Sequence, residues 1–151
     1  MPRAGIALVL LVAGCSSGGV DIVRPEIQII QLYGPTDLAS ARGQGSMTAQ
    51  FAFRVLNRAL EPITLRRVQL ESSGDGGYAL RREDRPFSIP IGPGEIVEER
   101  VEALAYFRLM PSGSASNEPV TLRATFHFDS PAGSFRQIVL RNIGQFSDGP
   151  R

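Results

Sequence analysis

Apolar and polar residues alternate along several short stretches of this chain, most regularly in residues 47–57 and 120–128. The apolar phase of these two stretches consists of Phe51, Phe53 and Val55, and of Val120, Leu122, Ala124, Phe126 and Phe128. Alternation with a period of two, carried by aromatic and β-branched side chains, is typical of a strand with one buried face. Both stretches are therefore predicted to be strands, with Arg54 and His127 on the opposite, solvated phase.

Weaker strand patterns fill much of the remaining chain, at residues 20–33, 63–72, 78–82, 87–89, 95–103 and 134–143. In the first of these, Ile27 and Ile29 are expected to face inward, with Leu32 as a further candidate. In the last, Ile138 and Leu140 are expected to face inward. Pro25 places the start of the first strand at an edge of the sheet, because proline cannot donate a ladder hydrogen bond.

The doubled polar pair Arg66-Arg67 interrupts the period of its strand. Before the pair the apolar residues are Ile63 and Leu65, and after it they are Val68 and Leu70, on the other phase. One additional residue, as in a β-bulge, explains this change of phase.

Segments rich in glycine, proline or serine separate the predicted strands, at residues 35–45, 73–77, 90–94, 111–119 and 129–133. Thr36 or Asp37 is suited to cap a single helical turn in the first of these loops. Residues 104–110 fit either a short helix or a continuation of the preceding strand. No repeating helix separates the strands, so the pattern predicts one all-β domain, an antiparallel sandwich of about seven strands.

The first 15 residues follow a different pattern. Arg3 precedes an unbroken apolar run, residues 6–13, which is far shorter than the roughly 20 residues of a membrane span and is typical of a secretory signal. The run closes in Val12-Ala13-Gly14-Cys15, which resembles the lipobox of bacterial lipoproteins. The resemblance implies cleavage between Gly14 and Cys15 and acylation of Cys15, and several acyl chains hold a protein firmly at a membrane.

This interpretation divides the chain into a signal peptide at residues 1–14, a lipidated N-terminus and flexible tether at 15–21, the sandwich at 22–145 and a loose tail at 146–151. Ser16, directly after the cysteine, is similar to the pattern of outer-membrane lipoproteins, which implies an outer-membrane anchor facing the periplasm. An extended chain spans at most roughly 3.3–3.6 Å per residue. Contacts of the domain are therefore expected close to the membrane.

Composition excludes several classes of function. The chain has 16 Lys+Arg and 15 Asp+Glu, and losing Arg3 with the signal leaves 15 of each, so nucleic acid is not an expected partner. Nothing near the single His127 in the sequence supplies the nucleophile and orienter that a catalytic triad needs, and one histidine beside an acylated cysteine does not make a zinc site. We expect no enzyme activity, no cofactor and no metal.

Three segments carry a second resemblance: Phe51-Ala-Phe-Arg-Val-Leu-Asn57, Glu61-Pro-Ile-Thr-Leu-Arg-Arg-Val-Gln-Leu70 and Phe87-Ser-Ile-Pro-Ile-Gly-Pro-Gly94. They resemble the late-embryogenesis-abundant group-2-like domain, also called the water-stress and hypersensitive-response domain. That family has a strand ending in asparagine, a partner strand opening with Pro-Ile, and a later Ile-Pro before a glycine turn. The resemblance implies an Ig-like or fibronectin-III-like sandwich without catalytic residues, and a role in stress tolerance or envelope assembly. Arg58 stands where the family has a proline.

Two groups of residues are candidates for a partner surface. One is apolar and contains Tyr106, Phe107 and Met110; the other is basic and contains Arg81, Arg82 and Arg85. Apolar burial supplies affinity at an interface, while arginines at its rim set orientation and rate. The arginines at 66–67 and 81–85 are also expected to face Glu95, Glu98, Glu99 and Glu102 across strands.

These observations favour a non-enzymatic, membrane-anchored lipoprotein that acts as an interaction or structural module of the cell envelope, with a protein partner. A second hypothesis is a binding protein for a lipid or another small apolar ligand. It requires a cavity of about 300 Å³ or more between the sheets, lined by Phe51, Phe53, Leu122 and Phe126. A third hypothesis, a stress-protective domain, rests on the family resemblance.

Overall fold

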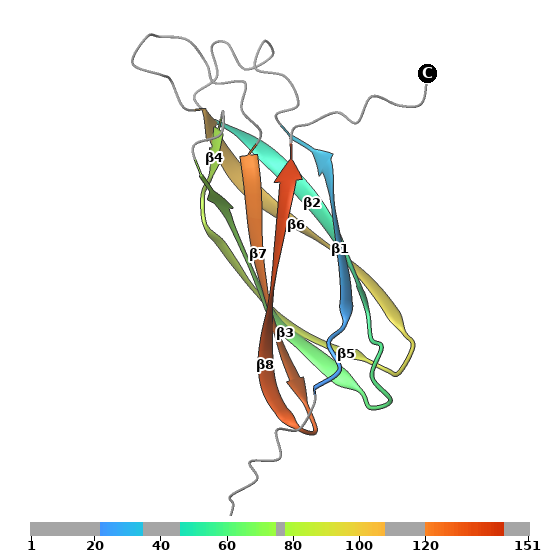
Figure 1. Ribbon diagram of the computed structural model, residues 1–151. Coiled ribbons are helices and arrows are strands. Elements are labelled where there is room, and N and C mark those ends of the chain that lie inside the picture. Colours follow the sequence, from blue (N-terminus) through green and yellow to red (C-terminus); the bar gives the residue numbers. More distant parts are fainter. Residues whose placement is uncertain (1–21, 35–45, 75–77, 108–119, 144–151) are drawn as a thin grey trace, which may run out of the picture.

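A computed structural model describes residues 22–34, 46–74, 78–107 and 120–143, and every regular element in these ranges is a strand. The strands are β1 (Glu26–Tyr33), β2 (Ser46–Leu56), β3 (Ile63–Ser73), β4 (Tyr78–Leu80), β5 (Glu83–Ile91), β6 (Ile96–Phe107), β7 (Val120–Ser130) and β8 (Gly133–Ile143). They form two antiparallel sheets, which we call sheet A (β1-β2-β6-β4) and sheet B (β5-β3-β7-β8) (Figure 1). The predicted all-β sandwich is confirmed, with eight strands in the described ranges.

The apolar phase of the two most regular stretches fills the space between the sheets. Every one of these eight side chains is at most 2% exposed, whereas Arg54 is exposed on the other phase of β2. The ring of Phe53 in sheet A packs edge-on against Phe126 in sheet B, with centroids 5.3 Å apart. Aromatic rings from both sheets thus meet at the centre of the core, where such contacts add to the effect of burial.

A β-bulge in β3 brings both of its apolar phases into the core, as predicted. The register of β3 shifts between Leu65 and Arg67 against both β5 and β7. All four apolar residues on either side of the shift are at most 2% exposed: Ile63, Leu65, Val68 and Leu70.

The prediction for β8 is wrong, because Ile138 and Leu140 are 43% and 64% exposed. In the pairing with β7, Phe128 lies opposite Phe135 and Ala124 lies opposite Val139. Residues directly opposite each other share a face of the sheet, so the buried phase of β7 directs Phe135 and Val139 inward.

Leu32 also faces outward, with 46% of its surface exposed. Strict alternation places Leu32 on the opposite phase from Ile27 and Ile29, and the register shift between Gln31 and Tyr33 leaves Leu32 without a partner in β2. Pro25 directly precedes β1, which is an edge strand as expected.

Residues 104–107 belong to β6, so the short helix is wrong for this part of the predicted segment. Tyr106 pairs with Ser46 of β2 on one side and with Ala79 of β4 on the other, which holds the backbone extended from both sides. Residues 108–110 lie outside the described residues. The predicted signal peptide and tether, the helical turn at Thr36 or Asp37 and the tail at 146–151 also lie outside them.

The two ends of the sandwich carry different segments. We call the end at which β1 begins the N-terminal pole; it also holds the connections 57–62, 92–95 and 131–132 (Figure 1, lower end). The opposite end is the distal pole, where β1 and β8 end and β7 begins. A strand of 11 residues at about 3.3 Å per residue separates the poles by roughly 36 Å.

Tyr78 gives the domain a predicted sensitivity to alkali. Its side chain is 5% exposed, its hydroxyl has no hydrogen-bond partner among the described residues, and burial raises its pKa to about 12. An unfolded tyrosine titrates near 10. Between about pH 10 and pH 12 the unfolded chain therefore loses a proton that the folded chain keeps, so the unfolding free energy falls as pH rises, by about 1.4 kcal/mol per pH unit. Urea unfolding across this range should show the slope, and Tyr78→Phe should remove it. An unchanged slope in the variant contradicts the assignment.

Candidate interaction surfaces

Two of the predicted surface residues, Tyr106 and Arg81, lie together on the outer face of sheet A. Tyr106 is 40% exposed and lies opposite Ala79 in β4. The backbone N–H of Arg81 donates to the carbonyl oxygen of Leu104 at 2.7 Å, which extends the β4–β6 ladder by one residue. Arg81 follows Ala79 by two residues, and residues i and i+2 of a strand share a face. Since Ala79 lies opposite Tyr106, Arg81 lies on the same face as Tyr106.

Arg82 and Arg85 lie beside this pair at one lateral edge of the sandwich. Arg82 is exposed in the link between β4 and β5, and Arg85 is exposed in β5, the edge strand of sheet B. No carboxylate forms an ion pair with Arg81, Arg82 or Arg85 within the described ranges. The neighbouring Asp84 is engaged by Gln69 at 3.0 Å and by Arg67 at 3.5 Å. Within the part of the chain that the structure describes, the edge therefore presents three arginines that form no ion pair.

We call Tyr106, Arg81, Arg82 and Arg85 together the arginine edge. The structure brings these four predicted residues to one side of the molecule. The side chain of Phe107 and the whole of Met110 lie outside the described residues.

The other predicted arginine pair forms ion pairs within sheet B. Arg66 contacts Asp129 at 2.6 Å, and Arg67 contacts Asp84. Hydrogen bonds from Ser134 and Arg66 lower the pKa of Asp129 below its usual range. Of the glutamates predicted to face these arginines, Glu98 pairs with Arg54 across sheet A.

For Arg66-Arg67 that prediction about the glutamates is wrong, for a topological reason. Residues 96–102 lie in sheet A and Arg66-Arg67 lie in sheet B, so no ladder brings them together. Glu102 instead accepts a hydrogen bond from Gln50, and Glu95 accepts one from the backbone N–H of Gly92. Exposed pairs of this kind contribute little to stability.

His127 lies on the outer face of sheet B, opposite Arg67 and Arg136. The carboxylate of Asp129, on the same face two residues further along β7, contacts Arg66 and Ser134. The described ranges contain no group of three or more metal-binding side chains. They also contain no helix with the length and apolar character that a membrane crossing requires.

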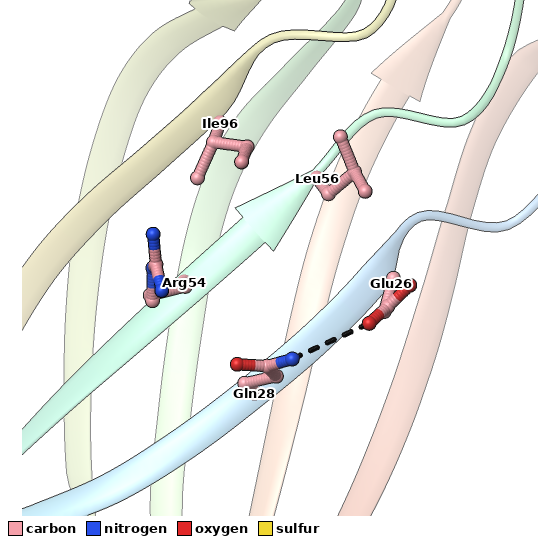
Figure 2. Close-up of a pocket in the computed structure, with 5 residues that line it drawn as sticks. All are labelled: Glu26, Gln28, Arg54, Leu56 and Ile96. Carbon is pink, nitrogen blue, oxygen red and sulfur yellow. Dashed lines mark hydrogen bonds between the residues drawn. The ribbon is translucent and has the colours of Figure 1, made fainter.

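A shallow hollow on the outer face of sheet A is lined by Glu26, Gln28, Arg54, Leu56 and Ile96 (Figure 2). Its volume is about 80 Å³, well below the 300–1,000 Å³ that is usual for ligand pockets. Gln28 donates a hydrogen bond to Glu26 at 3.3 Å. The Arg58 guanidinium also binds Glu26 and lowers the pKa of its carboxyl. The carboxylate of this hollow is thus already engaged by Gln28 and Arg58.

A larger hollow of about 310 Å³ lies at the N-terminal pole. We call it the N-terminal hollow. Its lining is mostly apolar and consists of Ile22, Val23, Ala59, Leu60, Glu61, Ile63, Ser130, Ala132 and Phe135. Leu60 stands at its rim with 94% of its surface exposed, and Val23 is 53% exposed. The sequence analysis did not identify this site. Its only signal is an apolar leucine in a short turn between two strands.

A buried asparagine, Asn57, fixes the turn that presents Leu60. Its side-chain Nδ2 donates to the carbonyl oxygens of Glu61 at 2.8 Å and Ile91 at 3.0 Å, and its Oδ1 accepts from the N–H of Ala59 at 2.9 Å. Asn57 is the one polar residue among the fully buried side chains of the described ranges. These hydrogen bonds therefore connect the turn to β5 and also close the turn internally.

The backbone of Asn57 ties the same turn to the neighbouring connection. Its N–H donates to the carbonyl oxygen of Glu95, and its carbonyl oxygen accepts from the N–H of Gly94. Gly94 has φ +71°, a left-handed conformation that glycine adopts without strain. Two connections of the N-terminal pole are thus held together by one residue.

The cavity that the ligand hypothesis requires does not coincide with either hollow. The four side chains named for it are Phe51, Phe53, Leu122 and Phe126; each is at most 1% exposed. None of them lines the hollow on sheet A or the one at the N-terminal pole.

Comparison with known proteins gives a likeness of fold. No protein-family model matches the chain, and no curated protein matches it. An X-ray structure of a Northeast Structural Genomics Consortium target is similar over 82% of this chain and 87% of its own, with a TM-score of 0.52 and 10% identity. A protein from Archaeoglobus fulgidus (78% and 91%, TM-score 0.46, 8% identity) and a FixG-related protein from Vibrio parahaemolyticus (80% and 95%, TM-score 0.40, 15% identity) match more weakly. The first likeness shows a shared fold and nothing about ligand or partner.

Proposed function

We propose that this chain is a non-enzymatic lipoprotein, anchored in the bacterial outer membrane through acylated Cys15, whose β-sandwich is an interaction module that faces the periplasm and binds a protein partner. The observation that carries the proposal is the arginine edge. Three exposed arginines without a carboxylate partner in the described ranges lie beside an exposed tyrosine. Tyrosine and arginine are enriched at protein interfaces, and uncompensated charge of one sign favours a partner of the opposite sign.

The edge suits an acidic surface of another protein. Arg81 and Arg82 stand side by side in a link of two residues, so their backbone is held by β4 on one side and β5 on the other. Guanidinium groups bind carboxylates through paired hydrogen bonds, which gives orientation as well as affinity. Tyr106 adds apolar area beside them.

The strand order supports the finer fold type in the proposal, an Ig-like or fibronectin-III-like sandwich. Sheet A contains β1, β2 and β6 as neighbours, and sheet B contains β3, β7 and β8. In an Ig sandwich the strands A, B and E lie in one sheet and C, F and G in the other. Counting β1, β2 and β3 as A, B and C, and β6, β7 and β8 as E, F and G, reproduces this division.

The filled core favours a protein partner over a ligand held between the sheets. The rings of Phe53 and Phe126 are in contact across the two sheets, and closely packed interiors leave little room for a guest. The stress-protective role remains a further proposal, which rests on the family resemblance alone.

Lipid anchoring is tested at Cys15, the sole cysteine of the chain. Cys15→Ser should abolish incorporation of radiolabelled palmitate, and the precursor should keep its signal peptide, because the processing enzymes act on the modified cysteine. Ser16→Ala is the control and should still be labelled and cut. Processing of the Cys15→Ser chain at the native position would show that the lipobox assignment is wrong.

The arginine edge is tested by crosslinking in intact cells. A photoreactive residue in place of Tyr106 should capture one defined protein. Reversing two charges by Arg81→Glu and Arg82→Glu should lower the yield of that adduct about tenfold. The control is the same probe in place of Leu140, which is 64% exposed on sheet B. Equal yields from the two positions, or an adduct insensitive to the charge reversal, would reject this surface.

A further inference from the structure

The N-terminal hollow opens beside the first described residues of the chain. Ile22 and Val23 form part of its wall, and they lead directly into β1. Two hydrogen bonds hold this leading segment against β8: Arg24 Nη1 donates to the carbonyl oxygen of Arg136 at 3.0 Å, and Gln137 Nε2 donates to that of Pro25 at 3.2 Å. The point at which the chain enters the sandwich is therefore fixed at the N-terminal pole.

The length of chain before Ile22 limits how far this pole can stand from a membrane. Six residues lie between Cys15 and Ile22, and the seven Cα–Cα steps that join the two span at most about 25 Å when fully extended. The sandwich itself is about 36 Å long. An acylated Cys15 therefore keeps Ile22, at the N-terminal pole, within about 25 Å of the bilayer, a distance shorter than the sandwich itself.

The N-terminal pole carries an unusual apolar surface. Leu60 is 94% exposed and Val23 is 53% exposed, and both border the same mostly apolar hollow. Leu60 does not occupy a loose turn, since the hydrogen bonds of Asn57 tie that turn to β5 and to the connection at 92–95. The fold holds a leucine in water, and exposed apolar patches of this kind mark sites of contact with a protein or a membrane.

Charges around the hollow fit lipid headgroups. Arg24, which directly follows the lining residue Val23 in the chain, is exposed and forms no ion pair within the described ranges, and Glu61 is exposed and lines the hollow. A guanidinium binds headgroup phosphate, and a carboxylate attracts the ammonium of phosphatidylethanolamine. An amphipathic surface with apolar and charged parts arranged in this way suits the interface between headgroups and acyl chains.

We propose that the N-terminal pole docks on the bilayer surface, with Leu60 and the N-terminal hollow in contact with phospholipid at the level of the headgroups. This inference rests on the proposed function, since it takes Cys15 as the lipid anchor. Docking gives the sandwich one orientation on the membrane, with β1 and β8 running away from the bilayer. The arginine edge is then held away from the surface, where a periplasmic partner can reach it.

The test uses the full mature chain, acylated at Cys15 and reconstituted in vesicles of phosphatidylethanolamine and phosphatidylglycerol at a ratio of 3:1. Acylation blocks the native thiol, so a label attaches only at an introduced cysteine. Leu60→Cys and Val23→Cys sample the N-terminal pole. Tyr33→Cys and Leu140→Cys, at residues 63% and 64% exposed, are the matched controls in β1 and β8. Each variant carries an environment-sensitive fluorophore, and the measurement is its quenching by phospholipids with a spin label on the headgroup or on the upper acyl chain.

Docking predicts that both labels at the N-terminal pole are quenched at least about threefold more than the two controls, with a blue shift of emission. Equal quenching at all four positions overturns the proposal while the anchor stands. A blue shift at Leu60→Cys without quenching by lipid also overturns it, because it shows that a protein or a second copy covers the site. If the chain fails to float with the vesicles, the anchor itself is wrong and docking falls with it.

Discussion

Phe126→Ala is expected to lower the free energy of unfolding by about 3–5 kcal/mol, and Phe53→Ala by a similar amount. Both rings are at most 1% exposed, and they touch each other across the two sheets. Removing either ring deletes its own burial and leaves a cavity against aromatic neighbours, since Phe53 also contacts Phe87 and Phe126 also contacts Phe128. Urea unfolding followed by tyrosine fluorescence measures the loss.

Controls for this prediction come from the opposite phases of the same strands. Arg54→Ala removes only an exposed ion pair with Glu98, and we expect a loss below about 1 kcal/mol. His127→Ala is also expected to cost little. Equal losses in the phenylalanine and control variants would contradict the assignment of inner and outer faces.

The two phenylalanines also make a test of direct contact. Because their rings meet edge to face at 5.3 Å, the double variant should be more stable than the sum of the single losses implies, by about 0.5–1.5 kcal/mol. Strict additivity would show that the two rings do not share the centre of the core.

Asn57→Ala is expected to cost about 3 kcal/mol, a large effect for a polar residue. The substitution removes three side-chain hydrogen bonds at a fully buried position. The groups that lose Asn57 as a partner are the carbonyl oxygens of Glu61 and Ile91 and the N–H of Ala59. An unpaired buried polar group costs about 1–3 kcal/mol. The control is Asn142→Ala, an exposed asparagine that accepts one hydrogen bond from Thr121 and should matter little. Similar losses in the two variants would reject the bracing role.

Asn57→Asp sharpens this prediction because the shape of the side chain is kept. The new carboxylate oxygen would face two carbonyl oxygens in place of the Nδ2 donor, so the charged form is disfavoured in the folded state. Its folded pKa is then raised, and the stability of the variant should be greatest at low pH and decline as pH rises through that value. Relative to the native chain, the deficit should be smaller at pH 4 than at pH 7. A deficit independent of pH would show that Asn57 Nδ2 does not donate to both oxygens.

The strands of the core were predictable because their patterns admit one interpretation. In β2 and β7 the apolar residues occupy only one phase over most of the strand, so burial of that phase follows directly. The bulge in β3 was predictable for the same reason, since two apolar pairs on opposite phases must both be buried.

The errors arose where the chain alone admits two arrangements. Residues 138–140 of β8 are apolar on both phases, and only the register with β7 decides which phase is buried. Leu104 and the residues after it carry both helical and strand periodicity, and pairing with β2 and β4 decides for a strand. Which partner each arginine or glutamate contacts depends on the sheet to which its strand belongs.

The sequence by itself determined the all-β class, the phase of β2, β3 and β7, and the basic stretch at residues 81–85, because each is a local property of residue order. It also carries the pattern on which the lipid anchor is proposed. Only the tertiary structure decided that Tyr106 lies with Arg81 on one face, and that Asn57 ties two connections together at the N-terminal pole. The same holds for Leu60, which is held in solvent beside Ile22. These are relations between residues about 25 to 40 positions apart, and their geometry is set by strand register and sheet order, which long-range packing selects.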